Sequence, residues 1–274
     1  MVTLSLIDRE NGDVPSKPTD EGPDPGSFLM NPLIRKLSNY IDLPQADRTV
    51  LEALSRKPEH IVAHTDLIRE GAAPDRVYLI LTGWACRYKV LPDGQRQIMA
   101  YFIPGDLSDQ RIFILRRMDH SIATLTAASV VAIPAQTMID RTRRHPRIAQ
   151  ALWWNTLVDE SVTRKWVVNV GQRKALERVA HLICEMFVRA RAVGLSDGLS
   201  FDFPITQTDL ADTVGLTLVH TNRMLQELRA ERLIAWTRHK LTVLDFDRLA
   251  ALSMFNPQYL HLEHEGRDRP DRSG

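Results

Sequence analysis

The spacing of apolar residues changes twice along the chain. From Asn31 to about Leu54 they recur every three or four positions, which predicts helix. From about Ile61 to Pro134 the apolar runs are short, rich in β-branched and aromatic residues, and separated by turn residues, which predicts strands. From Pro146 the helical spacing returns and continues. We therefore expect an α+β chain with an all-β unit between helical segments.

The strand region contains a strong hairpin signal. Asp93-Gly94 separates the run that ends at Val90 from the run that begins at Gln97, and Asp-Gly between two such runs favours a tight hairpin turn. Strands this short and this regularly spaced are typical of an antiparallel barrel or jelly roll. Such a barrel is large enough to enclose a small ligand.

A long helix is predicted to begin at Pro146, with Gly171 as a hinge at its end. Its apolar stripe comprises Ile148, Leu152, Val158, Val162 and Trp166. The stripe could pack wholly on its own domain or against the same helix of a second copy. We favour the second interpretation, which predicts a homodimer with its two-fold axis along this helix.

The segment from Thr206 to Leu228 has the pattern of a helix-turn-helix. Thr206 with Asp209 three residues later is a capping-box arrangement, and it predicts a first helix over Gln207–Val214. Gly215 suits the turn, and Thr217 is a good N-cap for a second helix. The positions expected to face the core are Leu210, Ala211, Val214, Leu216 and either Met224 or Leu225.

The second helix is expected to turn Arg, Asn and Gln side chains outward, and these residue types can bond guanine or adenine edges in the major groove. Runs on either side of Thr237–Lys240 predict a hairpin, or wing. From Thr217 to Lys240 five basic and two acidic residues give a charge of +3. The candidate DNA contacts are Thr206, Gln207, Thr217, Leu218, Val219, His220, Asn222, Arg223, Gln226, Arg238 and Lys240.

Composition narrows the class of protein. The 274 residues include 35 Lys+Arg and 34 Asp+Glu, so the net charge of +1 excludes a globally basic coat but permits a basic face. The two cysteines exclude a disulfide framework and paired zinc knuckles. No apolar run approaches the roughly 18 residues that span a membrane, and we expect a cytoplasmic protein. The sequence contains no P-loop, GxSxG or HExxH motif, so we predict no enzyme, catalytic residue or metal site.

The ends of the chain are polar and rich in proline, glycine and charge. We expect a disordered tail over residues 1–30, a sensor barrel over 31–145 and a dimerisation helix with hinge over 146–171. A winged helix-turn-helix follows over 172–255, and a flexible tail over 256–274.

The layout resembles the cyclic-AMP receptor protein and fumarate-nitrate regulator (Crp/Fnr) superfamily of bacterial transcription regulators. The matching segments are Gly83, Gly94, Phe102–Asp106, Arg173–Ala180, Thr206–Ala211, Gly215–Thr217 and His220–Leu228. The resemblance implies a cyclic-nucleotide-binding-like jelly-roll sensor, a dimerising helix, and a winged helix that binds a near-palindromic double-stranded DNA operator. It also implies RNA polymerase as a partner.

The sensor departs from that family. Members that bind cyclic AMP hold its phosphate with an Arg-Ser pair, and His120-Ser121 stands there in this chain. Imidazole lacks the bidentate fork of guanidinium, so we do not expect cyclic nucleotide binding. Gly105, Asp106, His120 and Ser121 remain candidates for a pocket that takes an unidentified small-molecule effector.

Other cofactors are not expected either. Residues 1–60 contain no Cys to hold an iron–sulfur cluster, which normally needs about four thiolates. His60, His64 and Cys86 are isolated, and such residues more often pack than ligate haem.

The second helix of the predicted helix-turn-helix, which is expected to read the DNA, also departs from that family. Val219 and Leu218 stand where well-known members place Glu and often Arg, while the guanine-reading arginine is kept at Arg223. The alternative function is a ligand-binding regulatory module that acts on a protein partner. That alternative gives no role to Asn222, Arg223 or the basic wing, so we favour a DNA-binding regulator.

Overall fold

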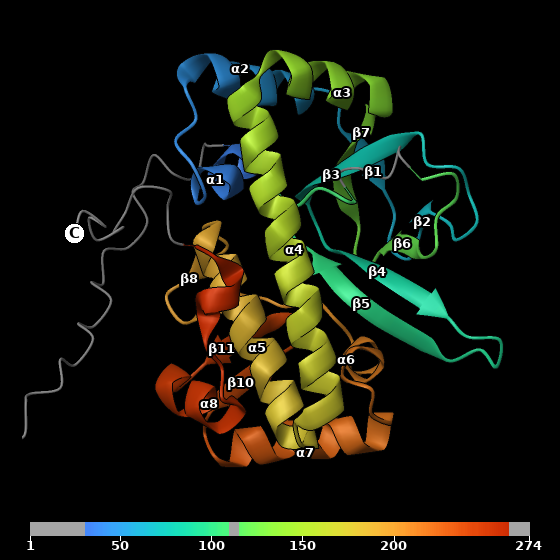
Figure 1. Cartoon of the computed structure of the whole chain (residues 1–274). Helices are drawn as coiled ribbons and strands as arrows, with labels where there is room; N and C mark the ends of the chain where they lie inside the picture. Colours follow the sequence, from blue (N-terminus) through green and yellow to red (C-terminus); the bar gives the residue numbers. More distant parts are fainter. Residues whose placement is uncertain (1–30, 110–114, 263–274) are drawn as a thin grey trace, which may run out of the picture.

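A computed structural model describes residues 31–109 and 115–262 (Figure 1). The predicted N-terminal tail, and the C-terminal tail from residue 263, lie outside the described residues.

The first helical segment forms two helices, α1 (Pro32–Ser38) and α2 (Gln45–Leu54). Asn31 caps α1, since its side chain accepts a hydrogen bond from Leu33 N, and Pro32 follows at the first helical position. Pro44, with a non-helical backbone, is the N-cap of α2.

The expected barrel is present as two antiparallel sheets that face each other. One sheet has the strand order β1-β7-β3 and the other β2-β6-β4-β5. The strands are β1 (Glu59–Ile61), β2 (Asp66–Ile68), β3 (Arg76–Thr82), β4 (Ala85–Val90), β5 (Arg96–Phe102), β6 (Ser121–Thr124) and β7 (Ala128–Pro134). The β4–β5 hairpin turns at Asp93-Gly94 as predicted.

A helix that the sequence pattern did not predict follows the barrel. This helix, α3 (Ala135–Arg144), is mostly polar and buries only Met138, so it offers few apolar positions from which to predict it. The long helix α4 (Pro146–Gln172) then runs the length of the molecule, past the barrel and down to the C-terminal unit (Figure 1).

The predicted hinge at Gly171 is wrong, because Gly171 lies inside α4. The helix ends at Arg173, whose backbone is extended, and α5 (Ala175–Ala192) begins after Lys174. The Arg173 guanidinium is buried and donates from Nε to Ser253 O at 2.9 Å, which fixes this connection to the C-terminal unit.

The C-terminal unit is a winged helix. Its elements are β8 (Ser196–Asp197), β9 (Ser200–Asp202), α6 (Gln207–Val214), α7 (Leu218–Ala230), β10 (Ile234–Thr237), β11 (Lys240–Val243) and α8 (Phe246–Ser253). The four strands pair in the order β10-β11-β9-β8. The wing β10–β11 was predicted, whereas the short strands β8 and β9 were not.

The prediction of a flexible tail from residue 256 is wrong for its first residues. A 3₁₀ helix, Pro257–Leu260, packs into the protein with Tyr259 and Leu260 buried. The Tyr259 hydroxyl donates to Glu185 Oε2 at 2.7 Å, and Trp166 Nε1 donates to the same oxygen at 2.9 Å. A fully buried carboxylate therefore joins this segment to α4 and α5.

None of the helices in the described parts of the chain is long and apolar enough to cross a membrane.

Candidate nucleic-acid interface and sensor pocket

Local hydrogen bonds define the helix-turn-helix as predicted. Thr206 Oγ1 accepts from Asp209 N at 3.0 Å, and Asp209 Oδ2 accepts from Thr206 N at 3.0 Å, which completes the capping box. Gly215 takes the left-handed conformation (φ 65°, ψ 44°) that ends α6. Thr217 Oγ1 then caps α7 by accepting from His220 N at 3.2 Å.

The inward face of the two helices is also confirmed. Leu210, Val214 and Leu225 are fully buried, Met224 and Ala211 are buried, and Leu216 is half-buried. These buried side chains pack α6 against α7, so a contact that holds α6 in place also acts on α7.

The outward face of α7 is exposed. Val219 is 82% exposed, and Asn222, Arg223 and Gln226 are exposed beside it. Leu218 and Thr217 are exposed, and His220 is half-buried. Thr206 is exposed at the start of α6, where Gln207 is half-buried. All the helix candidates thus lie on or beside one surface, and their contact with DNA stays a prediction.

The wing places two further basic residues at its tip. Thr237 pairs with Lys240, so Arg238 and His239 form a two-residue turn, and Arg238 has a positive φ of 55°. Arg238 and Lys240 are exposed. Arg229 on α7 donates to Trp236 O at 3.2 Å, which ties the wing to the recognition helix.

The apolar stripe predicted to form the dimer is buried inside the protomer. Ile148, Leu152, Val158, Val162 and Trp166 are each at most 8% exposed. The prediction that this stripe forms the dimer face is therefore wrong, because the stripe packs on its own chain.

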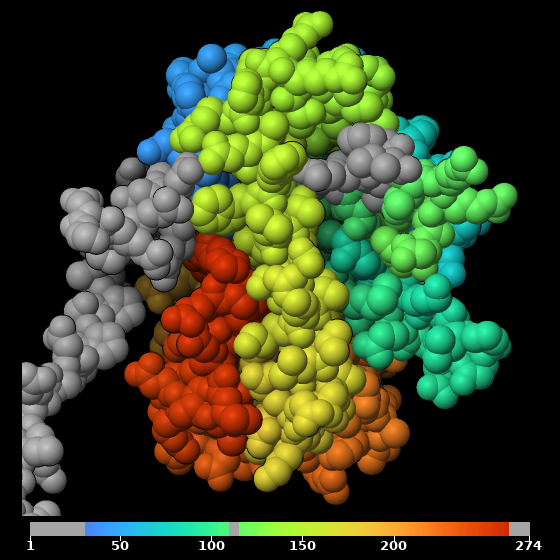
Figure 2. All heavy atoms as spheres, viewed as in Figure 1, coloured from blue at the N-terminus to red at the C-terminus, as the bar shows by residue number. Residues whose placement is uncertain are grey.

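The opposite face of α4 carries an exposed apolar row that the sequence interpretation missed. Leu157, Val167 and Val168 are 61%, 70% and 48% exposed, and Trp153 is 63% exposed one turn before Leu157. Arg164, seven residues after Leu157, forms an ion pair with Glu160 on the same face. Figure 2 shows this surface running down the front of the molecule. The spacing of seven and eleven residues from Leu157 was visible in the sequence, but both faces of the helix are apolar.

His120 and Ser121, at the predicted phosphate position, are engaged with protein groups. His120 Nε2 lies 2.8 Å from Asp109 Oδ2 and His120 Nδ1 lies 2.7 Å from Asp119 Oδ1. Asp109 also forms an ion pair with Arg87. Burial raises the pKa of Asp109, but the His120 hydrogen bond and the Arg87 charge outweigh it and hold that pKa below its ordinary value. Ser121 Oγ accepts from Glu70 N at 2.9 Å.

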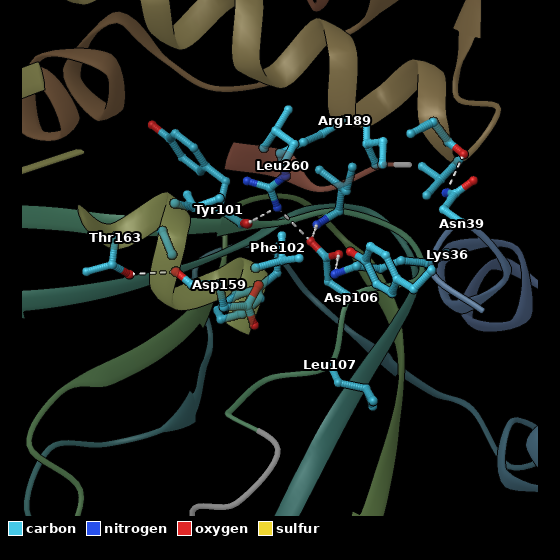
Figure 3. Close-up of a pocket in the computed structure, with 18 of the residues that line it drawn as sticks. Lys36, Asn39, Tyr101, Phe102, Asp106, Leu107, Asp159, Thr163, Arg189 and Leu260 are labelled. Atoms are coloured by element: carbon cyan, nitrogen blue, oxygen red, sulfur yellow. Dashed lines mark hydrogen bonds and ion pairs between the residues drawn. The ribbon is translucent and has the colours of Figure 1, made fainter. Parts of the chain in front are cut away.

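Asp106 lines a cavity whose lining residues do not include His120 or Ser121, although Arg87, the ion-pair partner of Asp109, also lines it. Asp106 accepts from Lys36 Nζ at 2.6 Å and from Arg189 Nη2 at 2.9 Å, and Figure 3 shows both cations converging on it. At Gly105 a Cβ would lie 2.5 Å from Pro32 O, so the position requires glycine. Asp106 thus joins the barrel to α1 and α5.

The cavity beside Asp106 is small. It has a volume of about 50 Å³ between α1, β5, α4 and α5, and its lining includes Tyr40, Phe102 and Asp159 (Figure 3). That is room for a few waters, far below the roughly 300–1,000 Å³ of ligand pockets. A larger cleft of about 320 Å³ separates the barrel from the winged helix, where Trp84, Pro204 and His239 line it.

The residues considered for haem do not converge. His60 lies on β1, His64 follows it, and Cys86 is buried on β4, where burial raises the pKa of its thiol to about 12. Among residues 31–109 and 115–262, no three His, Cys, Asp or Glu side chains are grouped so that they could hold a metal.

Two family models match the chain. A Crp-like helix-turn-helix domain matches residues 177–252 and a cyclic nucleotide-binding domain matches residues 58–145. A β-barrel of this type, followed by a long helix and a winged helix, defines a DNA-binding transcription regulator and not an enzyme.

The relatives are regulators of the same kind. The chain is 28% identical over 194 residues to the transcriptional activator protein FnrL of Cereibacter sphaeroides, covering 67% of this chain and 75% of that protein. It is 26% identical over 230 residues to the nitrogen fixation regulation protein FixK of Bradyrhizobium diazoefficiens, covering 83% and 94%. The structure of FixK2 from Bradyrhizobium japonicum shares the fold, with a TM-score of 0.64, 23% identity, and coverage of 72% and 96%. The chain belongs to the Crp/Fnr family of transcription regulators.

Proposed function

We propose that this regulator binds a near-palindromic operator as a homodimer, with one α7 and one wing reading each half-site. The observation that carries the proposal is the exposed row of Asn222, Arg223 and Gln226 beside a basic wing. These side chains can bond base edges, and the wing can contact phosphate.

The exposed row on α4 supports the dimer. Leu157 and Val168 lie eleven residues apart on one helix face, with Arg164 between them, which is the spacing of a coiled-coil seam. Two copies joined there would present two recognition helices to half-sites about one helical turn, roughly 34 Å, apart.

Selection of bound duplexes from a random DNA library tests this proposal with the purified full chain. The expected enriched sequence is an inverted repeat with a guanine in each half. Enrichment of a single unrepeated site, or no enrichment, would contradict the proposal.

The wing is expected to contribute affinity without base selectivity. Arg238→Ala and Lys240→Ala should weaken binding to all sequences alike and flatten the salt dependence by about one unit per lost phosphate contact. Binding across a salt series measures this, with Lys57→Ala, an exposed lysine near α2, as the charge-matched control. An unchanged salt slope in both wing variants would remove the wing from the interface.

Cyclic AMP and cyclic GMP are expected not to bind at micromolar concentration. The phosphate would meet His120 and the acidic Asp109 in place of an unpaired guanidinium. Calorimetry with the wild type measures this. Micromolar affinity that is lost in His120→Ala would overturn the expectation and assign the pocket to a nucleotide. We also infer that no haem or iron–sulfur cluster is needed, and that an effector, if the barrel takes one, is of another class.

We infer that RNA polymerase is a protein partner of this regulator. We also infer that the protein is located in the cytoplasm. FnrL and AadR, which match this chain, are named as transcriptional activator proteins, and activation requires access to polymerase at the promoter.

A further inference from the structure

A strand of the sensor barrel contacts the first helix of the helix-turn-helix directly. Arg96, at the start of β5, donates from Nη2 to Asp209 Oδ1 at 2.5 Å and from Nε to Asp212 Oδ2 at 2.7 Å. One guanidinium therefore bridges two carboxylates on successive turns of α6, which a single ammonium group could not match. Figure 1 shows β5 and α6 side by side, although 113 residues separate Arg96 from Asp209.

Two more residues of β5 complete the contact. Gln97 Nε2 donates to Thr213 O at 3.1 Å, and the Tyr101 hydroxyl lies 2.5 Å from Thr213 Oγ1. The Tyr101 ring is buried and packs edge-on against Trp84 and Trp166, with centroid distances of 6.0 and 6.1 Å. A buried aromatic layer therefore backs the polar contacts.

Asp209 also holds the helix that it begins. Its Oδ2 accepts from Thr206 in the capping box while its Oδ1 accepts from Arg96. Burial raises the pKa of Asp209, but the hydrogen bonds from Thr206 and Arg96 hold it below its ordinary value. Since α6 packs against α7, a contact that holds this carboxylate to the barrel also restrains the recognition helix relative to the barrel.

We propose that Arg96 is a positioning residue for DNA reading: by clamping α6 to β5 it fixes the distance between the two recognition helices of the dimer. The inference rests on the proposed binding of two half-sites. Without the clamp, each winged helix is held less firmly against its own sensor, and the dimer tolerates half-sites at altered spacing.

The test compares operators with the selected spacing, with one base pair inserted between the half-sites, and with a single half-site. The full-length wild type is expected to lose about tenfold or more in affinity on the insertion. Arg96→Ala should lose about tenfold on the selected operator, keep its single-half-site affinity, and discriminate the two spacings less than about threefold. Arg76→Ala, an exposed arginine paired with Asp75 on β3, is the control and should behave as wild type.

A second variant keeps the test decisive if Arg96→Ala destabilises the fold by leaving Asp209 unpaired. Asp212 does not cap α6 and its side chain is 24% exposed, so Asp212→Ala should fold and show the same relaxed spacing more weakly. Arg96→Lys should fall between wild type and Arg96→Ala. Thermal melting separates loss of fold from loss of positioning.

The outcomes distinguish two failures. If the wild type discriminates spacing and both Arg96→Ala and Asp212→Ala discriminate it equally well, Arg96 has no positioning role. If the wild type binds the operators of both spacings with equal affinity, the proposed binding of two half-sites is wrong. The positioning role of Arg96 is then wrong as well.

Discussion

Leu157→Arg is expected to convert the protein into a monomer at micromolar concentration and to lower operator affinity more than about a hundredfold. Leu157 is 61% exposed in the middle of α4, so within the protomer arginine costs little. In the dimer two added guanidinium groups would meet near the two-fold axis, and the neighbouring carboxylate of Glu160 is already paired with Arg164. The operator affinity falls because the second half-site is no longer bound by a linked partner.

Sedimentation measures the first effect and operator titration the second. Val62→Arg is the matched control, because Val62 is 72% exposed on the barrel and away from α4. It should leave the dimer intact. A stable dimer of Leu157→Arg would show that another surface joins the protomers. Val162→Arg should instead destabilise the protomer, since that side chain is only 8% exposed.

Arg223→Ala is expected to reduce operator affinity by about 5- to 150-fold per half-site, which corresponds to about 1–3 kcal/mol for a lost bidentate contact with guanine. Arg223 is exposed one turn beyond Val219 on the outward face of α7, and its fork matches guanine O6 and N7. Both half-sites lose the contact, so the effects combine.

The informative measurement is the ratio of the affinities for two operators that differ at the guanine. Wild type and Arg223→Ala are titrated with the selected operator and with a version in which the guanine is replaced. The variant should bind the two duplexes nearly alike, while Lys57→Ala should discriminate as the wild type does. If Arg223→Ala still discriminates fully, Arg223 does not read that base.

The helix-turn-helix could be predicted from the sequence because its signals are local. The cap at Thr206, the left-handed Gly215 and the cap at Thr217 each act within four residues, and α6 has the predicted bounds. The β4–β5 hairpin follows in the same way from Asp93-Gly94, and the wing follows from the apolar runs on either side of its turn.

The face of α4 that we propose for the dimer could not be predicted because both sides of the helix are apolar. Periodicity identifies Val158 and Leu157 equally well, and only the packing of the barrel and α5 decides that Val158 is buried and Leu157 exposed. The partners of the predicted effector residues could not be predicted for a related reason. Asp106 forms ion pairs with Arg189 and with Lys36, which is 70 residues away in the sequence. The local sequence around Asp106 does not indicate which distant residues pair with it.

The central claim is that two copies of α7 read one operator. The most direct measurement is the stoichiometry and affinity of the full chain on the selected inverted repeat, compared with the same duplex carrying one scrambled half-site. We expect two protomers on the intact operator and an affinity loss of at least about a hundredfold when one half-site is scrambled. One protomer per intact operator, or equal affinity for the two duplexes, would contradict it.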